Sequence, residues 1–230
     1  KIIVGYSPGG GADFSARVVA DKMAEYLGQP VVVENKPGAG ASIAMMAVKN
    51  SAPNGLTLGV GSPSPFGTNF IFMKPEYSVN DFIAVAGTYE SPWLLVTQSS
   101  LPFKTYADMI NYVRSNPGKL SNGGTVNGND SIRMDIIKRQ EKIDVGFVGY
   151  KGGALAKADF LGGHIHFLTD IVPSLKPVVD EGKGHVLAIG YERRLDLYPG
   201  VPTIAELGIP DIADPQWYNL VVPKGTPAPI

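Results

Sequence analysis

The sequence of 230 residues contains no cysteine. This absence excludes disulfide bonds, thiolate metal sites and a cysteine nucleophile. Histidine is scarce as well. His164 and His166 alternate along a strand-like stretch and would point to opposite faces, while His185 stands alone beside glycines. No carboxylate or second histidine lies at ligand spacing from any of them, so the sequence predicts no metal site and no cofactor.

An excess of charge of one sign is also lacking. Lys plus Arg (20) nearly balance Asp plus Glu (21), which leaves a formal net charge of −1 at pH 7. No global field would then recruit nucleic acid or an anionic membrane surface. The longest apolar runs have only the length of strands, so we expect no segment embedded in a bilayer. Any anionic ligand must therefore be held by local groups.

Glycine (28) and proline (19) are abundant and lie between short apolar runs, the pattern of a compact α/β protein with many loops. In the first part of the chain, strand-like and helix-like segments alternate, which implies parallel strands joined by right-handed crossovers. Asp13 stands where a helix N-cap is expected. The expected elements are strands at 2–6, 31–33 and 56–60 and helices at 14–27 and 42–49.

A strand-rich stretch at 82–97 interrupts this alternation, which then starts again. The second series predicts helices at 106–114, 131–140, 154–161 and 175–180 and strands at 120–122, 145–148, 166–168 and 186–189. Two such series predict an α/β protein with two lobes, each a mixed sheet flanked by helices, and a ligand cleft between the lobes. We place lobe I at residues 1–97 with 186–230 and lobe II at residues 98–185.

Three polar loops follow predicted strands and precede predicted helices. In the first, Ser7-Pro8-Gly9-Gly10-Gly11-Ala12-Asp13, the glycines leave the backbone accessible and the helix start supplies free N–H groups. The others are 123–129, with Thr125 and Asn127, and Tyr150-Lys151-Gly152-Gly153. One such loop alone fits a plain tight turn as well as an anion site. Three at the carboxyl ends of strands favour ligand binding, because open α/β sheets bind ligands at that edge.

Catalytic and nucleotide motifs are missing. No Gly-Lys-Ser/Thr follows the first loop, and Gly38-Ala39-Gly40 lacks the third glycine of a dinucleotide fingerprint. There is no Gly-x-Ser-x-Gly elbow, so Ser62 and Ser64 are interpreted as loop hydroxyls. Trp217 and Tyr218 fit the core and a pocket wall equally well. The sequence therefore does not favour an enzyme.

Longer motifs accompany these loops along the whole chain. The first loop continues into Ala16-Arg17, and the second motif is Val33-Glu34-Asn35-Lys36-Pro37-Gly38-Ala39-Gly40. Further motifs are Asn116-Pro117-Gly118-Lys119-Leu120, Tyr150–Ala154 with Leu161-Gly162-Gly163, Val201–Glu206, Trp217-Tyr218 and Pro223–Pro229. In this order the motifs resemble the Bug receptor family, the binding proteins of tripartite tricarboxylate transporters.

The resemblance implies a type II periplasmic binding protein fold, export with a cleaved leader, and capture of a small carboxylated solute for membrane transporter subunits. We expect a monomer that is not an enzyme. The family normally continues with further helices, so the resemblance implies that a C-terminal piece is absent after Pro229. The alternative is a ligand-sensing extracytoplasmic receptor of a signalling system, since the same fold serves sensors. An enzyme acting on a carboxylic acid comes third.

The resemblance also nominates ligand-binding residues by position, namely Ser7, Gly9, Gly10, Gly11, Asp13, Tyr150, Lys151, Gly152 and Asp170. We add Phe14, which follows the first loop, and, from other predicted strand ends, Ser62, Ser64, Phe66, Thr125 and Asn127. The two phenylalanines and the 125–129 loop are expected to select the far end of the ligand.

Two departures from the family pattern bear on specificity. Ile171 replaces the second aspartate of a usual pair, and Asn122-Gly123-Gly124-Thr125 departs from the common aromatic-Gly-Ser pattern. The latter loop is expected to help set which solute fits. None of the three glycine loops contains arginine, so we expect backbone N–H groups and water, not Arg17, Arg114 or Arg133, to hold the carboxylate.

Overall fold

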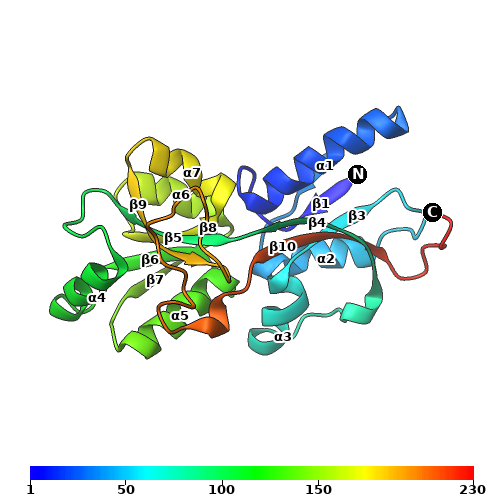
Figure 1. Ribbon diagram of the computed structural model, residues 1–230. Coiled ribbons are helices and arrows are strands. Elements are labelled where there is room, and N and C mark those ends of the chain that lie inside the picture. Colours follow the sequence, from blue (N-terminus) through cyan, green and yellow to red (C-terminus); the bar gives the residue numbers. More distant parts are fainter. The chain divides into compact units, whose positions relative to one another are not determined.

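The computed structural model describes residues 1–230, which form two compact units, each with its own five-stranded sheet (Figure 1). The first unit comprises Lys1–Glu90, Val126–Gly128 and Trp217–Ile230, and the second comprises Ser91–Thr125 and Asn129–Gln216. Each sheet contains both parallel and antiparallel strand pairs and is flanked by helices. The predicted fold class, two α/β lobes with mixed sheets, is therefore confirmed.

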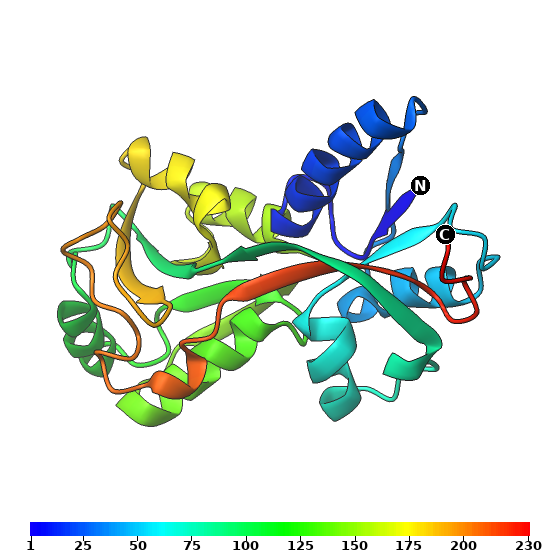
Figure 2. The ribbon, with the colours of Figure 1, turned by 45° about the vertical axis from the view of Figure 1, so that its right-hand side comes forward.

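The sheet of the first unit has the strand order β2-β1-β3-β10-β4. Its strands are β1 (Ile2–Val4), β2 (Val33–Asn35), β3 (Leu58–Gly61), β4 (Phe82–Ser91) and β10 (Gln216–Pro223). β1 runs parallel to both β2 and β3, whereas β10 is antiparallel to β3. β4 and β10 lie side by side (Figure 2). The short strand β1 is completely buried, as its run of β-branched residues favours.

Helices cover both faces of this sheet. They are α1 (Gly11–Leu27), α2 (Ser42–Lys49) and α3 (Asn69–Phe72), with short helical turns at Ala39–Ala41, Ser64–Thr68 and Val79–Asp81. α1 packs Ala12, Ala16 and Ala20 against the face of Ile2 and Val4. α2 packs its own apolar residues against the opposite face, which carries Ile3. The alternation of side chains along β1 thus gives the sheet a core on each side.

The N-cap prediction for α1 was wrong. Gly10 caps the helix in an extended conformation, and Asp13 lies within the first turn. The helix begins earlier than expected because Asp13 accepts the N–H of Gly9, which fixes the glycine loop as the helix start. The helical segment at Ser64–Phe72 was not predicted at all. α1 ends as predicted, before Gly28 in the left-handed conformation.

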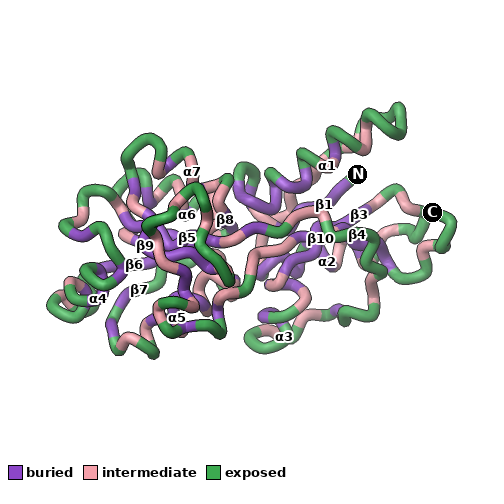
Figure 3. Tube along the Cα trace, viewed as in Figure 1, coloured by how far each residue is buried: buried purple, intermediate pink, exposed green.

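The sheet of the second unit has the order β7-β6-β8-β5-β9. Its strands are β5 (Trp93–Gln98), β6 (Ser121–Thr125), β7 (Gly146–Tyr150), β8 (Phe167–Ile171) and β9 (Gly184–Gly190). β6 is parallel to β7 and β8, and β5 is antiparallel to β8 and β9. Most strand residues near the centre of each sheet are buried (Figure 3).

Four longer helices flank this second sheet: α4 (Tyr106–Ser115), α5 (Asn129–Glu141), α6 (Gly153–Leu161) and α7 (Val172–Asp180). A short turn at Pro210–Ile212 precedes β10. α4 and α5 pack on the face that carries Trp93, Leu95 and Phe167. α6 and α7 pack on the face that carries Leu94 and Leu168. None of the helices has the length and apolar character that crossing a bilayer requires.

The compact units have other bounds than the two lobes expected from the sequence. β5 lies between β8 and β9, with Trp93 opposite both Ile171 and Gly190, so it belongs to the second sheet. The expected division at 97 and 186 would separate β5 from its partner β8. Of the strand-rich stretch 82–97, β4 belongs almost entirely to the first unit and β5 is an interior strand of the second.

Two further expectations for the second unit need correction. β6 extends to Thr125, so Gly123 and Gly124 lie in the strand rather than in a polar loop. His164 and His166 both precede β8 and do not alternate along it. The Nδ1 atom of His166 accepts the backbone N–H of Ser121 at 3.1 Å, and burial lowers the pKa of its ring. This contact ties the start of β8 to β6, a structural role.

Candidate functional site

The turn between β1 and α1 carries the first candidate loop. Gly9 has a φ of +83°, which favours glycine, and Gly10 is the extended N-cap of α1. In the first helical turn the Phe14 N–H donates to the Gly10 carbonyl at 2.9 Å. The N–H groups ahead of Phe14 have no acceptor within the helix, and the positive end of the helix dipole lies beside them. This turn has the features of an anion-binding loop.

The Asp13 side chain holds this loop in place through hydrogen bonds. Its carboxylate accepts hydrogen bonds from the Gly9 N–H, from Nε and Nη2 of Arg17, and from Nδ2 of Asn35, each at 2.9 Å. Burial alone would raise the pKa of Asp13, but the hydrogen bonds from Arg17, Gly9 and Asn35 outweigh it and hold the pKa below its usual value. Asp13 is therefore an ionised anchor of the loop and is itself only 3% exposed.

A second loop, between β2 and α2, has an unusual backbone. Ala39, Gly40 and Ala41 have φ values of +47°, +57° and +73°, and such a run in alanines is strained. The fully buried Asn69 stabilises it, because its Nδ2 donates to the carbonyls of Ala39 and Gly40 and to Ser42 Oγ. A Cβ on Gly40 would lie 2.4 Å from Asn69 Oδ1.

Sequence reasoning nominated neither Asn69 nor Asn35. Asn35 lies inside the second sequence motif, and its place in that motif could have marked it as a residue of the site. Asn69 lies in a helical segment that the sequence did not predict, so nothing marked it.

The remaining candidates of the first unit differ in accessibility. Ser62 is fully buried, and its hydroxyl lies 2.7 Å from the Tyr6 hydroxyl. Ser64 is buried at the start of a helical turn. Phe66 packs edge-on against Phe82, with ring centroids 5.4 Å apart. Phe14 is 48% exposed, so of these four side chains it is the one presented most openly to solvent.

Three parallel strands end together in the second unit. β6, β7 and β8 have matched registers, so Thr125, Tyr150 and Asp170 lie at the same edge of the sheet. Gly152 caps α6 with a φ of +149°. A Cβ on Gly153 would lie 2.9 Å from Asp170 Oδ2, so the glycine loop and Asp170 are in direct contact. The structure thus brings together these candidates, which are far apart in the sequence.

Asp170 is an enclosed carboxyl. Its Oδ2 accepts the Ser174 hydroxyl at 2.6 Å, and its Oδ1 accepts the Ile171 N–H at 2.8 Å. Burial raises its pKa, and these hydrogen bonds oppose the rise only in part. Ile171, which stands where the family pattern has a second aspartate, is buried in the sheet.

Tyr150 lies at this sheet edge, whereas Asn127 belongs to the first unit. The Tyr150 hydroxyl donates to Asp159 at 2.6 Å, and burial together with this carboxylate raises the pKa of Tyr150 to about 12. The hydroxyl is therefore engaged with α6, while Lys151 is exposed. Asn127 adopts a φ of +57°, and its carbonyl accepts the Thr68 hydroxyl at 2.6 Å within the first unit.

The three arginines considered as ligand clamps all have protein partners. Arg17 binds Asp13, and Arg114 donates to the Glu141 carbonyl at 2.8 Å. Arg133 is buried, donates to Asp214, and lies 4.8 Å over the Trp93 ring.

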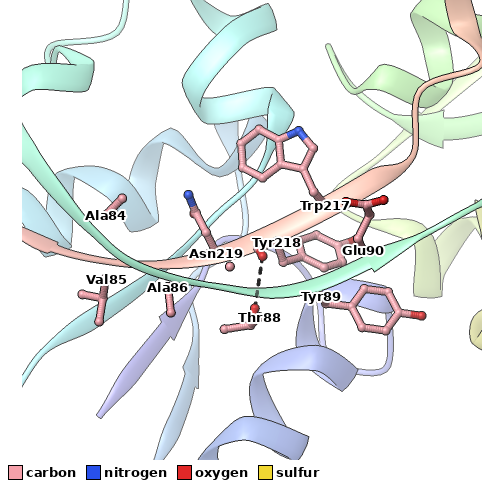
Figure 4. A pocket seen from close by; sticks show the side chains of 10 residues that line it. Ala84, Val85, Ala86, Thr88, Tyr89, Glu90, Trp217, Tyr218 and Asn219 are labelled. Atoms are coloured by element: carbon pink, nitrogen blue, oxygen red, sulfur yellow. Dashed lines mark hydrogen bonds between the residues drawn. The ribbon is translucent and has the colours of Figure 1, made fainter.

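The first unit also has an open hollow of about 720 Å³ along β4 and β10. In Figure 4 the Trp217 and Asn219 side chains lie on one side of the strands and Tyr89 on the other, and Thr88 donates to the Tyr218 carbonyl at 3.2 Å. Tyr218 is 7% exposed and belongs to the core, while both Trp217 and Tyr218 line the hollow. The core position and the pocket-wall position expected for this aromatic pair therefore both have support. None of the nominated ligand-binding residues lines this hollow.

Comparison with known proteins gives a consistent picture. Residues 15–230 match the model of the tripartite tricarboxylate transporter family receptor. The chain is 36% identical to the UPF0065 protein in gbd 5'region of Cupriavidus necator, over 98% of this chain and 69% of that protein. It is 31% identical to protein BugT of Bordetella pertussis, over 98% of this chain and 71% of BugT.

Solved structures agree. An R. palustris protein with adipate has a TM-score of 0.94 at 30% identity, covering 99% of this chain and 77% of that one. MatC from Rhodopseudomonas palustris with bound malate has a TM-score of 0.91 at 31% identity, covering 99% and 79%.

Proposed function

Because the chain belongs to the tripartite tricarboxylate transporter receptor family, a family of periplasmic solute-binding proteins, we propose that it captures a small carboxylated solute for the membrane subunits of a transporter. The observation that carries this proposal is the likeness, over nearly the whole chain, to two proteins solved with the dicarboxylates adipate and malate. The resemblance to Bug receptors that the sequence motifs indicated agrees with this assignment.

In the first unit we propose that the backbone of the first loop holds the carboxylate. Its N–H groups, which have no acceptor within the helix, and the dipole of α1 supply the attraction, and Asp13 fixes the loop through Gly9. The flanking side chains then shape the space beside the loop: Ser7, Gly10, Gly11, Phe14, Ser62, Ser64 and Phe66 are the proposed contributors. Phe14 is proposed to contact the solute directly, since it is half-exposed beside the loop.

In the second unit we propose that the edge formed by β6, β7 and β8 offers groups that bind solute. The start of α6 at Gly152 offers N–H groups in the same manner as α1. Tyr150 and Asp170 position this loop, and Lys151, Thr125 and Asn127 are proposed to contribute polar groups. Since Arg17, Arg114 and Arg133 are engaged with protein partners, we propose that none of them forms a bidentate pair with the solute.

We further propose that the protein binds its solute without turnover, acts as a monomer, and is located in the periplasm after removal of a leader. The partly buried Tyr6 shares a hydrogen bond with the Ser62 hydroxyl, and the first unit, which holds both candidate serines, contains no histidine, so an activated nucleophile is not supported. Size-exclusion chromatography tests the monomer, and fractionation of cells that express the native gene tests the location.

A thermal-shift screen with mono- and dicarboxylates tests the proposed function. A bound solute at one hundred times its dissociation constant should add about 2.7 kcal/mol of stability. Hits are then measured by calorimetry and incubated with the protein before mass analysis. Failure of every carboxylate to raise the melting temperature would refute carboxylate capture, and a chemically changed solute would refute binding without turnover. If deletion of the gene leaves uptake intact but abolishes a transcriptional response, the sensing role replaces the transport role.

A further inference from the structure

A group of polar side chains surrounds Gly124 on one face of the second sheet. Asn122 lies two residues earlier on the same face of β6. Thr169 stands on the neighbouring strand, one position beyond the paired Gly123 and Leu168. Asp130, from the first turn of α5, lies over the glycine, with Oδ2 only 2.6 Å from the position of a Gly124 Cβ. We call Asn122, Asp130 and Thr169 the Gly124 cluster; all three belong to the second unit.

This cluster has more buried polar atoms than protein partners. Asn122 is 0% exposed, and neither its Oδ1 nor its Nδ2 has a hydrogen-bond partner within the protein. The hydroxyl of Thr169, a residue 6% exposed, is also buried and has none. Buried polar groups are costly when unpaired, and they are normally satisfied by protein, by ordered water or by a ligand. The cluster is therefore built to take polar atoms from outside the protein.

Asp130 gives the cluster its electrostatic character. Its Oδ2 accepts the Thr125 N–H at 2.5 Å. The residue keeps some contact with solvent, yet burial is the main cause that raises the pKa of its carboxyl to about 6, and the charge of Asp170 on β8 raises it further. Arg133 of α5 and the Thr125 N–H oppose this rise.

The facing cation does not neutralise this edge of the sheet. Arg133 donates through Nη2 to Asp214 Oδ2 at 3.2 Å while its guanidinium lies over Trp93, so its charge is shared with a second carboxylate. Above pH about 6, the ionised carboxylate of Asp130 makes this edge negative beside the neutral hydrogen-bonding groups of Asn122 and Thr169.

We propose that the Gly124 cluster binds one end of the solute and that it prefers a neutral hydrogen-bonding end to a carboxylate end. This inference rests on the proposed function and narrows the solute to monocarboxylates with an amide or hydroxyl end. An amide N–H or a hydroxyl donates to Asp130, and Asn122 and Thr169 complete the contacts through water. A carboxylate in the same place would meet the like charge of Asp130.

Calorimetry with matched solute pairs tests the inference. Each pair is an unbranched dicarboxylate and its monoamide of the same chain length, with adipate and its monoamide among them. At pH about 8, the unmodified protein is expected to bind the preferred monoamide roughly tenfold or more tighter than its dicarboxylate. Asp130→Asn is expected to bring this ratio close to one, because it removes the charge and keeps the size.

Asp135→Asn is the matched control. Asp135 lies on the same helix, has a side chain 57% exposed and forms an ion pair with Lys138, so the ratio should stay unchanged. Asp130→Ser, which keeps an acceptor for the Thr125 N–H, replaces Asp130→Asn if that variant unfolds below room temperature. Melting curves establish folding of each variant before binding is measured.

Lowering the pH to about 5.5 protonates Asp130, so the unmodified protein is expected to gain affinity for the dicarboxylate relative to the monoamide several-fold. Part of this gain could come from protonation of the dicarboxylate itself. Asp130→Asn, measured at the same two pH values, shows that part alone, so its gain in relative affinity should be smaller. A dicarboxylate preferred by the unmodified protein at pH about 8, or a ratio unaltered in Asp130→Asn, overturns the inference while carboxylate capture stands. Failure of every carboxylate in the screen overturns both.

Discussion

Replacing Asp13 by asparagine tests the anchor of the first loop most directly. The side chain is 4% exposed and accepts hydrogen bonds from Gly9, Arg17 and Asn35. Asparagine has nearly the same shape, but it offers one oxygen instead of two and places an amino group where a donor now points. At least one donor, from the loop or from Asn35, then loses its acceptor. We expect a less stable loop and weaker solute binding.

The size of the effect follows from the burial of each partner. Arg17 has a side chain 51% exposed, so its ion pair contributes at most about 1 kcal/mol. Leaving one buried donor unpaired costs about 1 to 3 kcal/mol. The free energy of unfolding in urea should therefore fall by about 2 to 3 kcal/mol in Asp13→Asn. Carboxylate affinity should fall by about tenfold or more, since Gly9 is no longer held.

The dependence on pH checks the cause. The pKa of Asp13 is depressed in the folded protein, so its ionised form contributes stability above the unfolded pKa of about 3.9, and this contribution is lost as pH falls through the folded pKa. The difference in free energy of unfolding between the unmodified protein and Asp13→Asn should thus be largest at neutral pH and should become smaller below pH about 4.

Two controls bracket this experiment. Arg17→Met removes only the half-exposed partner and should cost no more than about 1 kcal/mol. Asp21→Asn changes an aspartate farther along the same helix and should have no measurable effect. If the free energy of unfolding of Asp13→Asn lies within about 0.5 kcal/mol of that of the unmodified protein, the anchoring role is refuted.

Three further predictions concern other parts of the protein. Gly190→Ala should lower the free energy of unfolding by about 3 kcal/mol or more, because the new Cβ would lie 1.7 Å from Trp93 Cε2, whereas Gly200→Ala, with nothing within 4 Å, should be near neutral in the same urea titration. Tyr150→Phe should cost about 1 kcal/mol and remove the tyrosine that titrates near pH 12; an unchanged absorbance titration would contradict that assignment. Arg133→Met and Arg114→Met should retain solute affinity within about threefold in calorimetry, and a hundredfold loss in either folded variant would show an arginine clamp.

Much of the fold was predictable because its signals are local. A run of β-branched residues marked β1, an apolar run marked β5, and helical periodicity with Gly28 marked α1. Pairing across the chain was not predictable in the same way, because nothing in residues 93–97 tells which sheet they join. The register of β5 with β8 and β9 decides this, and it arises from tertiary contacts.

For the candidate site, glycine loops and the family motifs predicted where ligand groups lie at strand ends. They did not predict the side chains that hold those loops. Asn69 and Asn35 act through hydrogen bonds to residues about 20 to 30 positions away in sequence. Asp130 was missed for a related reason, since its environment depends on Gly124 of the neighbouring strand and on Asp170 of another. Whether the nominated residues contact solute stays a prediction.

The position of β10 has a consequence for how the protein is made. This strand lies between β3 and β4, yet Tyr218 follows its hydrogen-bonded neighbour Thr88 by 130 residues. While the ribosome synthesises the chain, β4 has no adjacent strand in its sheet until β10 emerges, whereas the segments of the second unit are nearly contiguous. The second unit should therefore acquire protection from hydrogen exchange first. A nascent chain stalled before Gln216 would leave β4 open to proteases and chaperones.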